Sequence, residues 1–419
     1  MPVIARAFLL VVLLAVVIGG AVFAVASRRV GRTYDVPPPP IGRATSPDEI
    51  ARGGRLFRTN CLGCHAGSTD DAVPGAYTDA ASGPAQRRPI GGRVTGTPAF
   101  MGEIWAPNLT ADRDTGIATF SDGDLARLLR NGIRRDGRFA AAMPRFGRLG
   151  DADVAALIGF LRSTDPLLSP VTHWVPRPGL GVAGTLALAF AAGVDIRGEA
   201  HVAMPPRART AAYGRYLAVA AYACVDCHTE GFSSTDEKLQ SPALLAGGQF
   251  HRTPHGETIY STNLTPDPET GLAARTAADL ARLLTTGVGV DGLVTRSPMP
   301  VFRNIDDAEA DALFAYLRSV PSVVRRNPGP PRERLALDAP PERLFVTLGC
   351  VVCHGDHAPQ RTLLKQAARK PLAEIAAYVR HPEARDPQSQ MPTYAAVLDE
   401  AAALRLASWL RATDGAARP

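Results

Sequence analysis

The 419-residue sequence has no cysteine outside three short motifs, which hold all six cysteines of the chain. It also lacks any signature for binding a flavin, a nicotinamide or a phosphate group. These absences argue against a chain that oxidises a small molecule unaided. They also confine all cysteine chemistry to three places.

The sequence also lacks a long cluster of basic or of acidic residues. The formal net charge is +6, from 46 Lys and Arg against 40 Asp and Glu residues, and no long basic run occurs. Binding to DNA or RNA requires a basic face, whereas mixed charges are typical of a solvated surface. The composition therefore predicts no nucleic-acid partner.

What the sequence contains instead is one pattern, C-x-x-C-H, repeated three times. This spacing is typical of covalent attachment of c-type haem, in which two thiols bind the haem vinyls and the histidine binds the iron. A zinc ribbon does not need a histidine after each cysteine pair, and a redox C-x-x-C motif is not expected three times. The motifs predict three covalently bound haem c groups. Their residues are Cys61, Cys64 and His65; Cys224, Cys227 and His228; and Cys350, Cys353 and His354.

Methionine is scarce, with six residues, and three of them precede a proline at a matching place after each motif. Met143, Met299 and Met391 follow their motif histidines by 78, 71 and 37 residues. A thioether suits low-spin iron, and the adjacent proline stiffens the loop that holds the sulfur. We therefore expect these three methionines to be the distal ligands of the haem irons. Met101 and Met204 are interpreted as filler or linker residues.

The six histidines outside the motifs could replace a methionine as a distal ligand. We interpret each of them as a surface or loop residue. They are His173, His201, His251, His255, His357 and His381.

The N-terminal segment is the longest apolar run, with no charge over residues 7–26. Twenty apolar residues can span a bilayer, although Ala24-Val25-Ala26 also reads as a signal-peptide cleavage site. We favour a retained anchor over a cleaved signal. Residues 37–40 are four prolines, which we expect to form a stiff spacer off the membrane.

The motif spacing predicts three tandem domains with long loops around covalent haems, each of which we expect to be an all-α, cytochrome c-like fold. The linker at 166–206 contains an apolar stretch, residues 179–194, which is short for a membrane span. We expect this stretch to pack on a domain or lie at the membrane interface. The predicted parts are an anchor or signal (1–30), a Pro-rich linker (31–44), domain one (45–165), a linker (166–206), domain two (207–321), a linker (322–340), domain three (341–412) and a tail (413–419).

Domains one and two share a sequence repeat. NLTxDxxTG occurs at 108–116 and 263–271, followed in each by Met-Pro and by a closing helix that ends in LRS. The shared order indicates a tandem duplication, whereas domain three lacks the NLTxDxxTG loop. The matched side chains could bind a haem propionate or build a turn, and the sequence favours neither. They are Asn108, Thr110, Asn263 and Thr265.

With these motifs, including Ser-Thr-Asn-Leu-Thr-Pro-Asp at 261–267, the chain resembles the triheme cytochrome c subunits of membrane-bound periplasmic dehydrogenases. Those enzymes oxidise alcohols, aldehydes or sugar acids such as gluconate. The resemblance implies a catalytic partner subunit that holds PQQ, flavin or molybdopterin. It also implies electron transfer to quinone or a terminal oxidase on the periplasmic side of the bacterial cytoplasmic membrane.

Two other functions remain open. The chain could be a stand-alone membrane-tethered cytochrome that links respiratory redox proteins. It could instead be a multihaem enzyme such as a peroxidase, which requires an open position on one iron and nearby acid–base groups. A methionine in each domain argues against that open position, so no catalytic residue is predicted.

Overall fold

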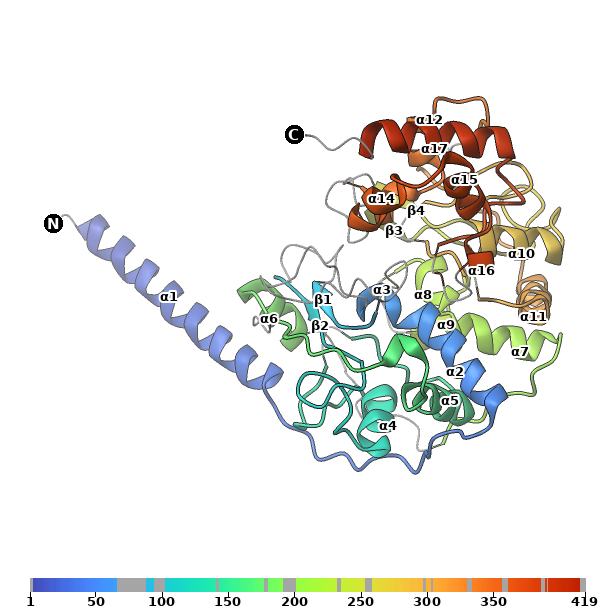
Figure 1. Cartoon of the computed structure of the whole chain (residues 1–419). Coiled ribbons are helices and arrows are strands. Elements are labelled where there is room, and N and C mark those ends of the chain that lie inside the picture. The colour runs from blue at the N-terminus through green and yellow to red at the C-terminus, as the bar shows by residue number, and fades with distance from the viewer. Residues whose placement is uncertain are drawn as a thin grey trace.

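The structure is a computed structural model that describes residues 3–65, 88–93, 102–140, 143–176, 180–190, 201–231, 235–252, 258–296, 299–302, 304–329, 334–355, 361–385, 389 and 391–414. Helices dominate this part of the chain (Figure 1). Two short antiparallel pairs accompany them, so the described residues are mainly helical rather than purely α. The pairs are β1 (Gly92–Arg93) with β2 (Trp105–Ala106), and β3 (Phe250–Arg252) with β4 (Thr258–Tyr260).

The first cytochrome-like unit is built on two crossing helices, α2 (Pro47–Asn60) and α5 (Asp151–Leu161). Ser46 caps α2, as its Ser-Pro-Asp-Glu start predicts. The helices cross at Gly53, where a Cβ atom would lie only 1.9 Å from the Ala156 carbonyl oxygen. Only glycine allows so close an approach of two backbones. Along the chain, α3 (Leu62–His65) and α4 (Asp122–Asn131) come between these two helices.

The second unit repeats this arrangement. Helix α7 (Ala211–Tyr216) crosses α11 (Asp307–Ser319) at Gly214, where a Cβ would lie 1.8 Å from the Ala312 oxygen. The chain continues through a π-helical turn, η4 (Leu217–Ala221), into α8 (Cys224–His228). The remaining helices are α9 (Thr235–Leu239) and α10 (Ala277–Thr286). The crossing thus has the same construction in both units, in agreement with the duplication seen in the sequence.

The inner helices α4 and α10 also begin and end alike. Ser121 and Thr276 each form a capping box with an aspartate three residues on, which satisfies backbone N–H groups of the first turn. Both helices end at a glycine in the left-handed conformation, Gly132 and Gly287. The repeat therefore preserves helix boundaries as well as motifs.

The third unit is smaller and has its own core. Its first helix packs on its last, where the rings of Phe345 and Trp409 lie 5.3 Å apart. Residues Val288 and Val294 of the second unit extend into this core. The helices are α12 (Pro341–Thr347), α13 (Cys350–His354), α14 (Arg361–Ala367), α15 (Leu372–Arg380), α16 (Pro382–Arg385) and α17 (Glu400–Asp414).

The first residues of both predicted linkers belong to the units that precede them. After the 3-10 turn η3 (Pro166–Leu168), the Val171 carbonyl accepts a hydrogen bond from Asn108. The Val323 carbonyl accepts the matching bond from Asn263. These contacts tie Val171 and Val323 to the preceding units, just beyond the predicted boundaries at residues 165 and 321.

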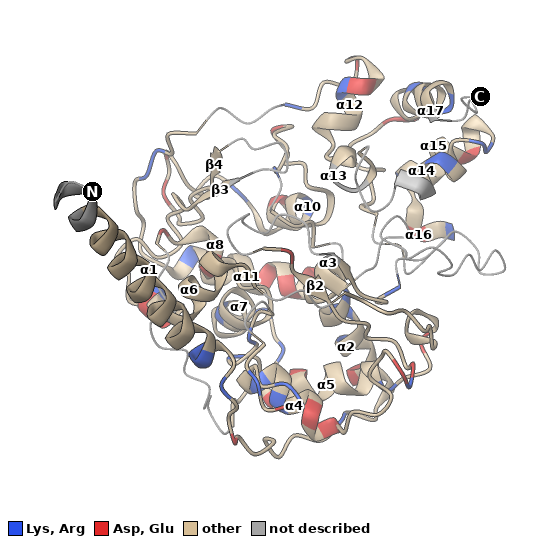
Figure 2. Ribbon diagram, turned by 90° about the vertical axis from the view of Figure 1, so that its left-hand side faces the viewer, with Lys and Arg blue, Asp and Glu red and all other residues tan. Residues whose placement is uncertain are grey.

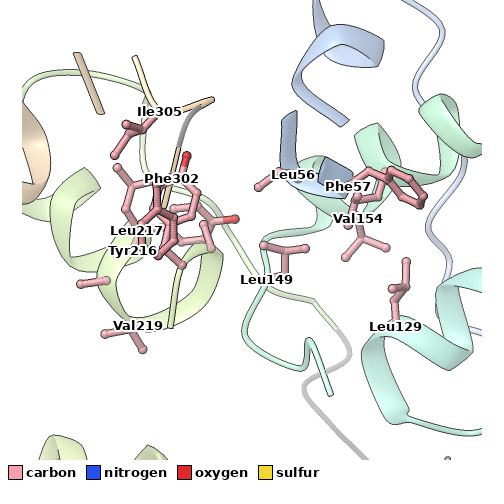
Figure 3. Packing of buried hydrophobic residues seen from close by; sticks show 14 of the residues in the cluster. Leu56, Phe57, Leu129, Leu149, Val154, Tyr216, Leu217, Val219, Phe302 and Ile305 are labelled. Atoms are coloured by element: carbon pink, nitrogen blue, oxygen red, sulfur yellow. The ribbon is translucent and has the colours of Figure 1, made fainter. Parts of the chain in front are cut away.

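The first two units share one hydrophobic core rather than two. Figure 3 shows Leu149 between a group around Phe57 and Val154 and a group around Leu217 and Phe302. Leu149 is 1% exposed, so no solvent layer separates the units at this point. Burial of a shared apolar surface holds the two units in a fixed relation.

A buried ionic network crosses the same interface. Arg52 donates two hydrogen bonds of 3.0 Å to Asp153 and pairs with Glu309 of the second unit. Tyr216 donates to Asp153 at 2.6 Å, and Tyr222 donates to Glu309 at 2.8 Å. Buried charges are tolerated when they are paired and hydrogen-bonded in this way. We call these five residues the interunit network.

The N-terminal helix α1 (Val3–Val30) projects from the body (Figure 1) and is uncharged over most of its length, with arginines at its carboxyl end (Figure 2). Among the described helices it alone is long and apolar enough to cross a membrane. Helix α6 (Val182–Phe190), from the predicted apolar stretch, packs beside it. The sequence predicted that this stretch packs on a domain or lies at the membrane interface; in the structure α6 packs beside α1, and contact with a membrane interface stays a prediction.

The proline run at 37–40, which the sequence predicted to be a stiff spacer off the membrane, lies against the first unit. Tyr34 donates a backbone hydrogen bond to Gly137, and Ala44 donates one to Ala155. A Cβ on Gly123 would lie 3.1 Å from Pro38, so the prolines pass directly over α4. The extended polyproline backbone has no internal hydrogen bonds, and here it gains its contacts from the first unit.

Candidate haem sites

The motif histidines of the first two units are oriented in the same way. His65 Nδ1 lies 2.9 Å from the Pro107 carbonyl oxygen, and His228 Nδ1 lies 2.8 Å from the Thr262 oxygen. Because a carbonyl can only accept, Nδ1 carries the proton and Nε2 keeps its lone pair. A metal-binding histidine is commonly oriented by such a bond. Both rings are therefore suited to ligate iron through Nε2.

Burial favours the neutral form of these two rings. Both histidines are 7% exposed, and their burial lowers the pKa of each imidazole, against the opposing effect of the carbonyl hydrogen bond. Only a neutral imidazole can donate its Nε2 lone pair to a metal. The electrostatics thus agree with the tautomer that the hydrogen bonds require.

The repeated NLTxDxxTG loop supplies the orienting carbonyls, because Pro107 and Thr262 directly precede its asparagine. The Asn263 side chain donates to Thr270 at 2.8 Å and to Val323 at 2.7 Å, and accepts from the Thr265 backbone at 2.9 Å. Asn108 makes the corresponding three bonds in the first unit. Both amide protons of each asparagine are used within the protein, so the turn interpretation is favoured over propionate binding.

Two further residues of the loop explain its strict pattern. Asp112 accepts hydrogen bonds from the backbone and the hydroxyl of Thr115, and Asp267 does the same for Thr270. A Cβ on Gly271 would lie 2.1 Å from the Thr265 oxygen, so this turn closes only with glycine. Sequence analysis identified the loop but not its task of holding the carbonyl against the histidine. The recurrence of the loop after both C-x-x-C-H motifs was the available signal.

The cysteines lie within or beside short helices, α3, α8 and α13, that bring each pair about one turn apart. Burial raises the pKa of the Cys61 and Cys224 thiols to about 12. A zinc ribbon needs thiolates and four converging ligands. Within the described residues, no three His, Cys, Asp or Glu side chains converge on one point. The side chain of Cys353 lies outside the described residues.

The three predicted distal methionines lie at the edges of the cores. Met143 and Met299 are partly buried against the core shared by the first two units, and Met391 lies against the core of the third. These placements keep each methionine in the unit whose motif it was assigned to.

The remaining methionines and histidines fall into other roles. Met204 packs against the shared core near Gly150, as expected of a filler residue. His201 pairs with Asp151, and His381 lies 3.2 Å from Glu383. His173 is in a loop, but it is buried at 7% exposure rather than on the surface. Three others, Met101, His255 and His357, lie outside the described residues, and His251 is in β3.

A pocket of about 300 Å³ adjoins the histidine-orienting loop of the second unit and is lined in part by Thr262 and Asn263. It also contains Arg275 and Arg325, which are ion-paired with Asp291 and Glu230. The pocket is thus mixed in charge.

Comparison with known proteins agrees with this geometry. Residues 50–165 match the family model for cytochrome c. This part of the chain is a cytochrome c domain. Such a domain implies covalently bound haem c, and the buried His65 with its free Nε2 lone pair fits that group.

Relatives extend the similarity beyond this domain. The chain is 26% identical over 286 residues to the fructose dehydrogenase cytochrome subunit of Gluconobacter japonicus, covering 65% of this chain and 53% of that protein. It is 28% identical over 289 residues to a diheme cytochrome c-type protein of Cereibacter sphaeroides, covering 66% and 87%. It is 41% identical over 117 residues to a nicotinate dehydrogenase subunit of Pseudomonas putida, covering 27% and 9%.

The resemblance to cytochrome subunits of dehydrogenases is thereby confirmed. The chain spans about half the length of the fructose dehydrogenase subunit and a tenth or less of the nicotinate dehydrogenase subunit. The substrates of those proteins are therefore not assigned to this chain.

Proposed function

We propose that this chain is a triheme c-type cytochrome that accepts electrons from the catalytic subunit of a periplasmic dehydrogenase and passes them to quinone or a terminal oxidase. The observation that carries the proposal is the repeated histidine–carbonyl arrangement in two C-x-x-C-H units. It prepares the Nε2 atoms of His65 and His228 for iron, and the third motif has the same C-x-x-C-H pattern.

The proposed haem-binding residues follow from the motifs. The cysteine pairs form the thioethers, His65, His228 and His354 are the proximal ligands, and Met143, Met299 and Met391 are the distal ligands. Bound haem c supplies one-electron transfer, which needs no substrate chemistry from the protein. The six cysteines are Cys61, Cys64, Cys224, Cys227, Cys350 and Cys353.

The task of the polypeptide is then to keep the haem surroundings unchanged between oxidation states. Each orienting carbonyl is fixed by an asparagine whose amide protons are both bonded. The shared core and the interunit network also fix the first unit relative to the second. Restricted movement of ligands and units lowers the reorganisation that accompanies each transfer step.

The chain is proposed to face the periplasm, with α1 as a retained anchor. Support for the anchor comes from the length and apolar surface of α1. The predicted domain boundaries stay a proposal; Val171 and Val323, just beyond two of them, accept hydrogen bonds from the loops of the preceding units.

The haem count is tested by measuring iron and pyridine haemochrome per chain, together with intact mass. Three haems per chain are expected, and replacing Cys350 and Cys353 by alanine should leave two. A parent chain that carries two haems would contradict the triheme proposal. The comparison matters because one relative is named a diheme protein.

The partner is tested by purification from native membranes in mild detergent, with mass spectrometry of the co-purifying proteins. A stoichiometric dehydrogenase subunit that reduces the haems when its substrate is added is expected. Recovery of the chain alone, or with quinol-oxidising subunits, would instead support the second candidate, a tethered respiratory shuttle. The diheme relative, of which the chain covers 87%, is the observation that favours this candidate.

A further inference from the structure

Helix α6 is an apolar element with no obvious place in a haem-binding fold. It is inserted between the first two units and contains no charged residue. It packs beside α1, yet Val182 at its start is 62% exposed, and Ala183 and Ala187 are exposed as well. An apolar helix that is left half open in water would expose surface that the hydrophobic effect favours burying.

The position of α6 along α1 is defined by burial. From Phe8 to Val25, every residue of α1 is exposed, whereas Ala26 is 0% exposed and Ser27 is half-buried. The protein therefore covers α1 only at its carboxyl end and leaves the rest bare. Since α6 packs on α1, it lies beside the last turns of that helix, where the chain would leave the bilayer (Figure 1).

The haem-binding body cannot swing freely away from this point. Only a few residues separate Val30 from the hydrogen bond between Tyr34 and Gly137, and Thr33 forms a bridge with Arg138. Arg127 also donates to the Val36 carbonyl. These contacts hold α6 and the nearby face of the body close to the end of α1, and therefore close to the bilayer that would surround α1.

The polar residues near α6 have the chemistry of a membrane interface. Exposed Arg28, Arg29 and Arg32 follow the apolar part of α1, where long basic side chains at a helix end can reach the lipid interface. Trp174 is 68% exposed and precedes Leu180 by six residues, which limits their separation to about 20 Å. Tryptophan is enriched at the level of the headgroups because its ring is amphipathic.

We propose that α6 inserts into the bilayer leaflet on the side of the haem-binding body, beside the last turns of α1, and thereby fixes how that body faces the membrane. Nine residues make a helix of about 14 Å, which is too short for a hydrocarbon core of about 30 Å. Helix α6 is therefore an interfacial element and does not span. The proposal rests on α1 being a retained anchor and adds a second lipid contact to it.

The test uses the full haem-loaded chain in vesicles of phosphatidylethanolamine and phosphatidylglycerol. A spin label is attached to Ala187→Cys, and its collisions with oxygen and with a water-soluble nickel complex are compared. The matched control is Ala401→Cys, an exposed position on α17 of the third unit. If the native cysteines are thioether-bonded, the introduced cysteine is the reactive thiol in each variant.

The expected result is at least a fivefold higher oxygen-to-nickel collision ratio at position 187 than at position 401. An equal ratio would mean that α6 faces water and would overturn the proposal. Low collision with both reagents would mean that protein covers α6, which also overturns it. If Ala187→Cys misfolds, Ala183→Cys on the same helix gives the same readout.

Two measurements on the same samples separate this proposal from the proposed function. An intact mass that begins at Ser27 would show cleavage after Ala26 and would overturn the membrane contact, because α1 would be lost. Three haems per chain together with a water-exposed label would refute the membrane contact of α6 and leave the proposed function standing. A lipid-exposed label in a chain that carries fewer than three haems would refute the triheme proposal and leave the membrane contact of α6 standing.

Discussion

The interunit network offers the sharpest test of how the first two units are held together. Replacing Arg52 by methionine keeps an unbranched apolar stem but removes the guanidinium group and its positive charge. Asp153 and Glu309, 1% and 0% exposed, would then remain buried without a cation. Removal of one member of a buried ion pair costs about 3–5 kcal/mol, because the other charge is left uncompensated.

The geometry places this variant near the lower end of that range. Asp153 keeps its hydrogen bond from Tyr216, and Glu309 keeps its bond from Tyr222. Burial raises the pKa of both phenols, so they remain protonated donors after Arg52 is removed. We therefore expect Arg52→Met to lower the free energy of unfolding by about 3 kcal/mol.

The assay is urea unfolding of the haem-loaded chain, followed by far-UV circular dichroism and by haem absorbance. The control is Arg134→Met, which breaks an exposed pair with Asp136 and should change stability by about 0–1 kcal/mol. Adding Asp153→Asn and Glu309→Gln to Arg52→Met should recover at least half of the loss. A loss below about 1 kcal/mol for Arg52→Met, equal to that of the control, would refute the reasoning.

Four further outcomes are expected. Asn263→Ala should destabilise the second unit by about 1–3 kcal/mol, since buried backbone groups lose their partner, with little change in haem potential; a large shift in potential with unchanged stability would favour propionate binding. Gly214→Ala should cost about 1–3 kcal/mol in thermal unfolding, because the new methyl group overlaps the Ala312 oxygen, and an unchanged melting temperature would contradict the close crossing. Although burial opposes it, hydrogen bonds from Thr115 lower the pKa of Asp112. The ionised carboxylate therefore stabilises the fold above about pH 4, and this contribution is lost as the pH falls through the lowered pKa. Asp112→Asn should make the free energy of unfolding less dependent on pH in this range, and an unchanged pH dependence would count against the prediction. Met143→His should lower the potential of one haem in a redox titration, and three unchanged potentials would remove Met143 from the ligand set.

Much of the candidate site could be predicted from the sequence because its chemistry is local. The spacing of Cys61, Cys64 and His65 is fixed by covalent geometry over five residues and needs no tertiary information. The duplication was equally visible, because matched loops keep their residues when each has the same contacts to make. The cytochrome c match over 50–165 confirms the family that these motifs indicated.

Predictions about isolated polar residues and linkers were less successful, because their partners are distant in sequence. Asn108 bonds to Val171, 63 residues away, so the sequence could not choose between a turn and a propionate contact. The prolines at 37–40 predicted a stiff spacer, and the sequence could not show that Pro38 lies against Gly123 of α4. His173 is buried although its neighbours read as a loop.

The sequence by itself determined three attachment motifs, the repeat of the first two units and an apolar N-terminal helix. These features depend on residue spacing and on composition within a short window. The tertiary structure alone decided that a carbonyl orients His65 and His228, that Arg52 joins two units through Asp153 and Glu309, and that α6 lies beside α1. Each of these contacts joins segments at least 34 residues apart, and such a partner is fixed only when the whole chain packs into one core.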